Sequence, residues 1–153
     1  MSPDLATLPS RVGTELGVTD WERFDQAQVD AYAALTGEDL WIHTDPARAA
    51  GSPHGGTIVQ SSLLMARFAA WIRETGPWLP EPACPLNYGY DRVRIPAALR
   101  TGAAVRGRVV LTAFTRRAPG QMQAHIAIKA ERDDATTVIA ADWIIVFALG
   151  LGS

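Results

Sequence analysis

The sequence has little cysteine, little excess charge and no long apolar segment, and each shortage excludes a class of protein. Cys84 is the only cysteine, which excludes an internal disulfide bond and a zinc site built from several cysteines. No uninterrupted apolar run approaches the ~18 residues that a transmembrane helix needs. The net charge of −2 lacks the domain-wide basic excess that is typical of general nucleic-acid-binding proteins.

The start of the chain also lacks a targeting signal, because its first ten residues have neither the basic nor the apolar segment of a signal peptide. These absences predict a cytoplasmic protein that binds neither membranes nor nucleic acids. The chain has 153 residues, of which 48% are hydrophobic, and this is enough for one good core. We therefore expect one domain over residues 1–153.

Charged residues are unevenly distributed along the chain. Residues 1–45 contain nine acidic and two basic residues, whereas residues 92–117 contain seven arginines and no acidic residue. Thirteen of the 14 basic residues are arginines, whose guanidinium group suits phosphate. Two interpretations stay open: the arginines of 92–117 occupy outward-facing strand positions, or they form a binding surface for a phosphate-bearing ligand.

The first half of the chain has helical patterns. Residues 24–36 are expected to form a helix, and Asp25 and Gln28 near its start can form a capping box. Gly37 follows at the place where a left-handed residue often ends a helix. A second, short alanine-rich helix is expected to begin after Asp45, which can cap it. The segment between these helices is therefore expected to be a connection.

A change from helix to strand patterns divides the rest of the chain. Residues 57–74 are apolar around most of the circumference, which predicts a long buried helix, and a proline-rich loop follows over 76–85. Strands are expected over 85–95, 104–115, 121–132 and 136–148. An Asp-Asp turn joins the last two as a hairpin, and the last strand is too apolar for a solvated edge. The pattern predicts an α+β fold in which an antiparallel meander wraps one central helix.

The stretch TGEDLWIHTDP, residues 36–46, places two acids close to a histidine. Glu38 and Asp39 lie five and four residues before His43. A carboxylate next to an imidazole can share proton transfer, and the apolar neighbour Trp41 would exclude water. The same residues also suit a solvated loop. The sequence has no G-x-S-x-G or Walker A motif, and its three histidines lack the spacing of metal ligands, so we expect no metal site.

A longer stretch around this motif, LTGEDLWIHTDPARAAGSPHGGTIVQ, resembles the MaoC-like hydratases, the family of (R)-specific enoyl-CoA hydratases and acyl dehydratases. The motif of this family runs Thr-Gly-Asp, three residues, then Ile or Leu before His, followed by Asp-Pro, an alanine-rich turn and a buried helix. A second block, LNYGYDRVRIPAALRTGAAVRGRV at residues 86–109, resembles the branch with nodulation-protein-N-like members. The resemblance covers about residues 15–148.

The resemblance implies a hot-dog fold, in which an antiparallel sheet wraps a long helix, and a homodimer or larger homo-oligomer. It implies that the protein adds water reversibly to trans-2-enoyl thioesters of coenzyme A or an acyl carrier, as part of fatty acid metabolism. The product is an (R)-3-hydroxyacyl thioester, and no cofactor is needed. In this family an aspartate and a histidine activate the water, and a main-chain N–H at the start of the buried helix binds the thioester oxygen.

The catalytic residues of the family map onto this chain with two changes. His43 occupies the position of the catalytic histidine, and Glu38 occupies that of the catalytic aspartate. Asp39 falls on a variable position and stays an alternative acid if its side chain turns inward. Gln60 and Ser61 replace the His-Gly pair of the helix start, so the resemblance implies that the Ser61 N–H, with Gln60 nearby, orients the thioester.

Further residues complete the expected site. Gly56 and Trp41 are expected to contact substrate, and the buried helix with the loop 76–85 would supply an apolar slot for the acyl tail. The arginines of 92–117 would contact the phosphates of coenzyme A. Two other functions stay open: a thioesterase with the same fold, or a catalytically inactive subunit that binds acyl thioesters or a partner.

Overall fold

The computed structural model of the protein describes residues 5–75 and 84–148, so most of the expected loop 76–85 lies outside the described residues. None of the helices in these two ranges is long and apolar enough to span a membrane. In chain order the elements are η1 (Leu5–Arg11), β1 (Glu15–Val18), β2 (Glu22–Arg23), α1 (Gln26–Thr36), α2 (Trp41–Thr44), α3 (Pro46–Ala49), α4 (Ser61–Glu74), β3 (Cys84–Arg94), β4 (Ala104–Ala118), β5 (Gln121–Arg132) and β6 (Thr137–Ala148).

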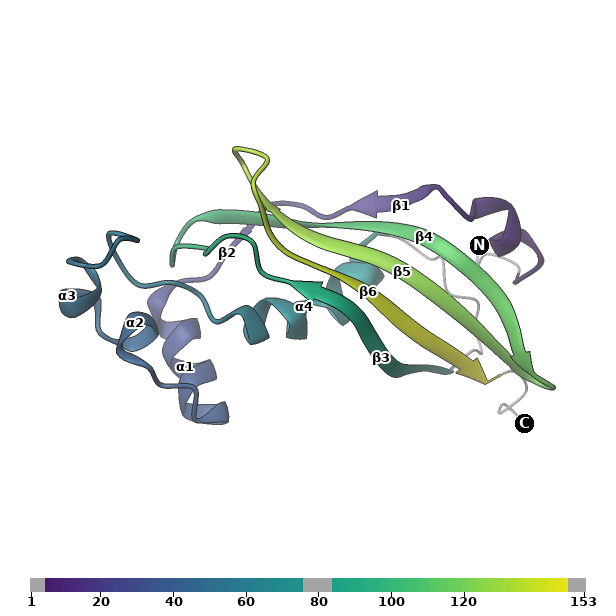
Figure 1. Ribbon diagram of the computed structural model, residues 1–153, viewed down its shortest axis with the longest axis horizontal. Coiled ribbons are helices and arrows are strands. Elements are labelled where there is room, and N and C mark those ends of the chain that lie inside the picture. Colours follow the sequence, from purple (N-terminus) through teal and green to yellow (C-terminus); the bar gives the residue numbers. More distant parts are fainter. Residues whose placement is uncertain (1–4, 76–83, 149–153) are drawn as a thin grey trace.

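The six strands form one antiparallel sheet in the order β1-β4-β5-β6-β3, with β2 also paired to β4. The sheet curves over α4, and α1, α2 and α3 lie together beyond one end of it (Figure 1). The four strands expected in the second half are confirmed, as is the hairpin between β5 and β6. The last strand, β6, lies between β5 and β3, as its apolar sequence predicted.

The expected simple meander is wrong in one respect. Strands β4, β5 and β6 follow one another as neighbours, but β3 pairs with β6 and not with β4. Residues 95–103 therefore connect β3, at one edge of the sheet, with β4, which lies beyond β6 and β5. This order keeps the apolar strand β6 away from an exposed edge of the sheet. This crossing segment later contributes to the candidate site.

The core lies between the sheet and one face of α4. Along β5, alternate residues are buried and point toward the helix; they are Ala124, Ile126, Ile128 and Ala130. The buried residues of α4 are spaced as one helical face; they are Leu64, Phe68, Trp71 and Ile72. The opposite side of α4 includes the exposed Ala66 and Ala69. The expectation of a helix buried around most of its circumference is therefore corrected to one buried face.

Helix α4 also begins later than the sequence predicted. It was expected from residue 57 but begins at Ser61, because the preceding residues are extended. The N–H of Ile58 donates to Ile42 O at 3.1 Å, and the N–H of Val59 donates to Leu99 O at 2.8 Å. β-Branched residues favour extended backbone, and here tertiary hydrogen bonds hold it. The start of α4 is thus fixed between two other segments of the chain.

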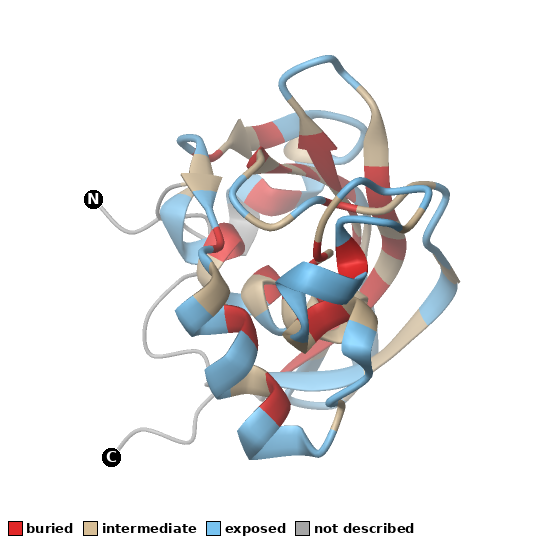
Figure 2. Ribbon diagram, turned by 90° about the vertical axis from the view of Figure 1, so that its left-hand side faces the viewer, coloured by how far each residue is buried: buried red, intermediate tan, exposed pale blue. Residues whose placement is uncertain are grey.

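The helix caps that the sequence predicted are confirmed. Asp25 Oδ1 accepts from Gln28 N at 2.9 Å, and Gln28 Oε1 accepts from Asp25 N at 3.0 Å. Gly37 ends α1 in the left-handed conformation with φ of 77°. Buried residues lie on one side of α1 while its other side is exposed (Figure 2). The Asp45 side chain caps α3 by accepting from Arg48 N at 3.0 Å.

The connection after α1 is not a plain loop, because it contains the one-turn helix α2. Successive residues of an α-helix are rotated by about 100°, so two residues that are two positions apart point about 200° apart. His43 is accordingly buried with 7% of its surface exposed, while Trp41 lies at the surface. This small helix decides which side chains of the 36–46 stretch face inward.

Candidate active site

A cavity of about 300 Å³ lies where the segment after α1 meets the start of α4. Its lining combines two ionisable groups and a serine with mainly apolar residues: Glu38, His43, Ile58, Val59, Ser61, Leu64, the segment 95–99 and Val138. Three of the residues expected to act on substrate are therefore at one cavity. Most of the apolar lining was not predicted from the sequence.

The ring of His43 is held in place through one of its two nitrogen atoms. Its Nδ1 lies 2.7 Å from Ile58 O, and a carbonyl can only accept, so the proton is assigned to Nδ1. Its main-chain oxygen accepts from Gln26 Nε2 at 2.7 Å, which ties α2 to α1. Nε2 is then the nitrogen that can exchange a proton with a molecule in the cavity.

Glu38 is a half-buried residue that forms hydrogen bonds with three residues. Its N–H donates to Thr36 Oγ1 at 3.3 Å, and its main-chain oxygen accepts from Gln60 Nε2 at 3.4 Å. Its carboxylate accepts from Ser62 Oγ. Glu38 directly follows Gly37, the residue that ends α1, and lines the cavity. Its main chain and its side chain are both hydrogen-bonded to the start of α4.

Asp39 is placed differently from its neighbour. Its side chain is exposed and is not part of the cavity lining. Its main-chain oxygen accepts from Thr44 Oγ1 at 3.1 Å, which holds this residue against α2. Of the two candidate acids, only Glu38 lines the cavity with His43.

The start of α4 brings Ser61 to the cavity. The first N–H groups of an α-helix have no acceptor within the helix and carry the positive end of its dipole. Gln60, the residue before the helix, is fully buried and does not line the cavity. Its Nε2 instead donates to Val29 O at 3.1 Å as well as to Glu38 O, so Gln60 anchors α1 and Glu38 to the start of α4.

Trp41 and Gly56 are not brought to the cavity. Trp41 is 36% exposed, and the Arg48 guanidinium lies 4.3 Å from its ring centroid. Gly56 lies against Arg100, whose Nη2 donates to Gly55 O at 2.9 Å. Within the described residues, neither of them lines this cavity, and their expected contact with substrate stays a prediction.

The residues that sequence reasoning missed are apolar and come from distant segments. The crossing segment 95–99 and Val138 line the cavity with Glu38 and His43, whereas Leu64 belongs to the buried helix that was expected to supply an apolar slot. No local spacing identifies them, because they meet only when the chain crosses the sheet. The segment does fall inside the second block of resemblance, residues 86–109, and this was the only available signal.

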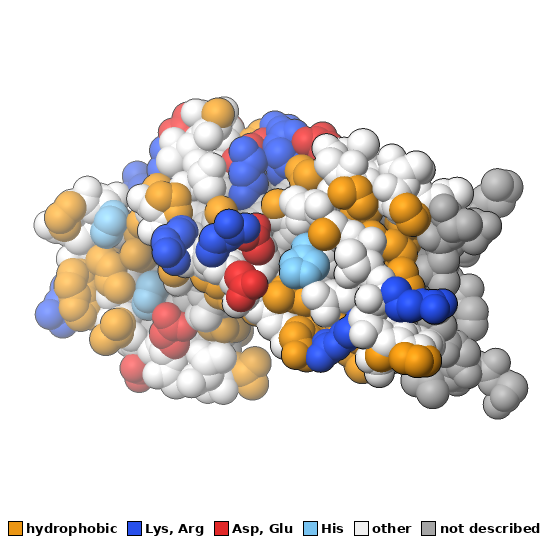
Figure 3. All heavy atoms as spheres, turned by 45° about the vertical axis from the view of Figure 1, so that its right-hand side comes forward, with side chains coloured by type: hydrophobic (Ala, Val, Ile, Leu, Met, Phe, Trp, Pro, Cys, Tyr) orange, Lys and Arg blue, Asp and Glu red, His pale blue; other side chains and the backbone are white. Residues whose placement is uncertain are grey.

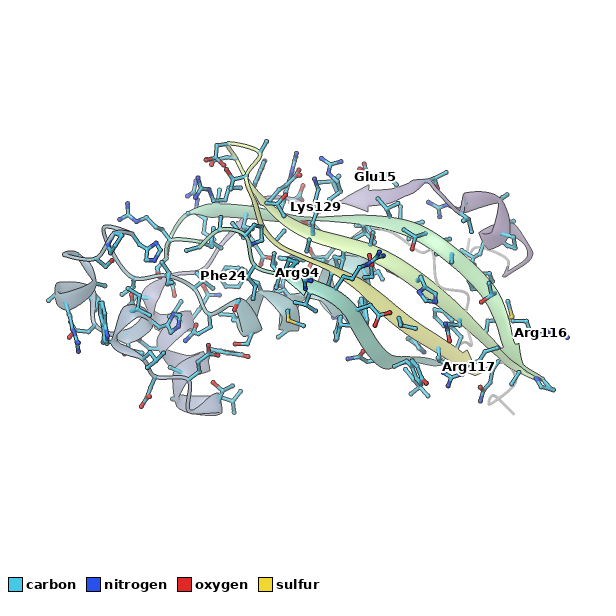
Figure 4. All side chains as sticks on the ribbon, viewed as in Figure 1. Glu15, Phe24, Arg94, Arg116, Arg117 and Lys129 are labelled. Atoms are coloured by element: carbon cyan, nitrogen blue, oxygen red, sulfur yellow. The ribbon has the colours of Figure 1, made fainter. Side chains whose placement is uncertain are left out.

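The arginines of 92–117 do not form one phosphate-binding surface. Arg92 pairs with Asp142, and Arg106 and Arg108 pair with Glu131. Arg116 and Arg117 lie at the end of the sheet away from α1, α2 and α3, whereas Arg94 lies much closer to these helices (Figure 4). On the face shown in Figure 3, basic side chains occur in separate groups, some of them beside acidic ones.

The Glu131 carboxylate is the shared acceptor of two of these arginines. Its side chain is 6% exposed, and Arg108 Nη2 and Arg106 Nη2 lie 2.9 and 2.8 Å from its Oε1. Hydrogen bonding from Arg108, with further contributions from Arg106 and Lys129, lowers the pKa of Glu131 to about 2 despite its burial. These arginines are thus engaged in structural ion pairs. Two other arginines of 92–117, Arg94 and Arg100, flank the cavity-lining segment 95–99 in the sequence.

Comparison with known proteins agrees with this geometry. Residues 7–132 match the MaoC like domain family. Nodulation protein N of Rhizobium leguminosarum bv. viciae is 36% identical over 144 residues, which cover 93% of this chain and 89% of that protein. The 3-hydroxyacyl-thioester dehydratase Z of Mycobacterium tuberculosis (strain ATCC 25618 / H37Rv) is 31% identical over 127 residues, which cover 83% of each chain.

A solved structure gives the same fold. The (R)-hydratase from A. caviae involved in PHA biosynthesis superposes with a TM-score of 0.69 at 24% sequence identity, covering 86% of this chain and 92% of that one. The antiparallel sheet curved over α4 is the hot-dog fold that the sequence resemblance implied. The match over most of the chain and the two similar relatives lead to one conclusion: this chain belongs to the MaoC-like domain family.

Proposed function

We propose that the protein is a hydratase/dehydratase that adds water reversibly to trans-2-enoyl thioesters and forms (R)-3-hydroxyacyl thioesters. The observation that carries this proposal is the shared cavity of Glu38, His43 and the start of α4. A carboxylate and an imidazole at one cavity supply the proton transfers of hydration, and a helix start supplies donors for a developing negative charge. The name of the mycobacterial relative, a 3-hydroxyacyl-thioester dehydratase, supports the same reaction class.

In the proposed mechanism, Glu38 and His43 act on one water molecule. The Glu38 carboxylate takes a proton from the water while the water oxygen bonds to C3 of the enoyl group. The π bond between C2 and C3 breaks, and its electrons move toward the thioester oxygen. These electrons then return to C2 and bond the proton, which the protonated Glu38 gives back on the same face, so that atoms and charge balance. Because Nδ1 carries the proton that is bonded to Ile58 O, His43 Nε2 is left as an acceptor that can hold the same water molecule.

The thioester oxygen gains negative charge in this step, and the Ser61 N–H at the start of α4 is the proposed donor. Its position next to Gln60 is favourable, because Gln60 is buried and anchored to Val29 and Glu38. Donors that are fixed before the reaction stabilise developing charge without a cost of reorganisation. Gln60 therefore contributes by positioning the helix start, and Ser61 contributes the contact.

The remaining features of the proposal concern the rest of the substrate and the assembly. Leu64 and Val138 offer an apolar wall for the acyl chain. Arg94 and Arg100 flank the lining segment and are the proposed contacts for the phosphates of coenzyme A or an acyl carrier. A homodimer is supported by β3, which lies at the edge of the described sheet with one neighbour, β6. The cytoplasmic location stays a prediction.

A crotonyl-CoA assay tests the proposed reaction. We expect the enoyl absorbance to fall without release of free thiol, and chiral analysis to identify the product as the (R)-3-hydroxyacyl thioester. Release of thiol at the same rate would identify a thioesterase instead. Tight binding without turnover, unchanged in His43→Ala, would identify an acyl-binding subunit and contradict the proposal.

A further inference from the structure

The carboxylate of Glu38 is held by the second residue of α4. Ser62 Oγ donates a hydrogen bond to Glu38 Oε2, because an ionised carboxylate can only accept. Ser62 is half-buried and belongs to the same first turn whose neighbour, Gln60, binds the main-chain oxygen of Glu38. Gln60 and Ser62, which are two positions apart, therefore fix the main chain and the side chain of one acidic residue.

The first turn of α4 is a rigid support for this contact. The helix is anchored in the core by Phe68 and Trp71, both fully buried. The N–H groups of Leu63 and Leu64 donate to Gln60 O at 3.1 and 3.3 Å, which closes the turn. A hydroxyl on such a turn restricts the side chain that it binds, and a site residue needs this restriction to keep its geometry.

A glutamate needs such a partner more than an aspartate does. The side chain of a glutamate has one more rotatable bond. Glu38 also directly follows the left-handed Gly37. With Oε2 bonded to Ser62, Oε1 has no hydrogen-bond partner among the described residues, and Glu38 lines the cavity. Oε1 is therefore the oxygen available to a water molecule.

We infer that Ser62 is a positioning residue: its hydroxyl orients the Glu38 carboxylate so that Oε1 faces the cavity. The inference rests on the proposed function for its catalytic consequence, but the contact itself can be tested without it. An aspartate at position 38 would be shorter by about one C–C bond, ~1.5 Å, and would lose the Ser62 contact. Glu38 and Ser62 thus act as a coupled pair.

A double-mutant cycle on kcat and KM for crotonyl-CoA tests the pair. We expect Ser62→Ala to lower kcat about 10- to 100-fold with KM within about twofold, because misplacing a reacting group by ~1 Å costs on the order of 10²-fold. Ser62→Thr keeps the hydroxyl and is expected to restore kcat to within about threefold. Glu38→Asp with Ser62→Ala is expected to be no slower than the slower single variant. Ser10→Ala, which removes an exposed hydroxyl bonded to Thr7 O, is the matched control.

Two results would overturn the inference: a Ser62→Ala enzyme with wild-type kcat, or a double variant whose loss equals the product of the single losses. Thermal unfolding separates this inference from the proposed function. If the wild-type protein hydrates no enoyl thioester, the proposed function fails, but the Ser62–Glu38 contact can still be tested. The melting temperatures of Ser62→Ala, Glu38→Gln and the double variant then form the double-mutant cycle. We expect the double variant to fall short of the summed Tm shifts by about 2–4 °C, and additive shifts would overturn the contact.

Discussion

At the scale of single residues, Gly107 sets the distance between the sheet and helix α4. A Cβ at this position of β4 would lie 2.6 Å from Cδ2 of the Trp71 ring, which is closer than two carbon atoms can approach. Trp71 is fully buried, and its Nε1 donates to Glu22, so the ring cannot move away easily. The absence of a side chain in β4 therefore permits a large one in α4.

We predict that Gly107→Ala lowers the free energy of unfolding by about 1–3 kcal/mol, because the added methyl group overpacks the core against Trp71. Gly89→Ala is the matched control, since a Cβ there meets no atom within 4 Å. Chemical denaturation of both variants measures the difference. Equal stability of Gly107→Ala and wild type would show that the helix and sheet can separate without cost.

The 36–46 stretch shows how far single residues could be predicted. The types and spacing of its acids and histidine left both a catalytic pair and a solvated loop open, and only the family resemblance favoured a site, with Glu38 as the acid and Asp39 as the alternative. In the structure, helix α2 buries His43 and turns Trp41 to the surface, while Glu38 lines the cavity and Asp39 is exposed. A turn of four residues has too little periodicity to be predicted from sequence. The catalytic roles of Glu38 and His43 stay predictions.

At the scale of secondary structure elements, Glu131 ties β5 to β4 and, through Arg108, is linked to β1. Arg106 and Arg108 of β4 bind its carboxylate, and Arg108 also pairs with Glu15 of β1. These arginines were expected either to face outward or to bind phosphate, and they do face outward from the core but are paired. Ion pairs between strands depend on register, which is the reason that the sequence alone could not assign the partners.

We predict that Glu131→Gln destabilises the protein at pH 7 by on the order of 2 kcal/mol, and that the loss depends on pH. The pKa of Glu131 is lowered from its ordinary value of 4.5 to about 2 by folding, so its charge stabilises the folded state above pH ~4.5. This contribution is lost as the pH falls from about 4.5 through about 2. Unfolding free energies of both proteins are therefore expected to converge over this range.

The control for this titration is Glu74→Gln. Glu74 is 46% exposed and pairs with Arg67 at the surface, where ion pairs contribute little. Its effect on stability is expected to be small at every pH. A pH-independent loss in Glu131→Gln would contradict the assignment of the stabilisation to the ionised carboxylate.

At the scale of the whole molecule, the four strands of the second half were predictable, whereas the short strands β1 and β2 and the strand order were not. Alternation in β5 and the apolar character of β6 identified both strands, and each lies where these patterns require. The placement of β3 next to β6 depends on a crossing of the sheet that leaves no periodic signal. Because the cavity is lined by that crossing segment, its apolar wall was missed together with the strand order.

The whole-molecule arrangement also explains why the polar part of the site was easier to predict than its wall. Glu38, His43 and Ser61 occur within one stretch of the chain, and a family motif marks them. The wall combines this stretch with residues 95–99 and Val138, which only the complete fold brings near. Residue types with chemical functions can be recognised in sequence, whereas apolar residues acquire their role from packing.

The central claim is that Glu38, and not Asp39, is the working acid. The most direct measurement compares kcat for crotonyl-CoA hydration in Glu38→Gln and Asp39→Asn, two neighbouring variants that each replace one carboxylate with an amide of similar size. Because Glu38 lines the cavity and Asp39 is exposed, we predict that Glu38→Gln loses about 10²- to 10⁴-fold while Asp39→Asn stays within about twofold of wild type. Full activity in Glu38→Gln with a large loss in Asp39→Asn would contradict the account.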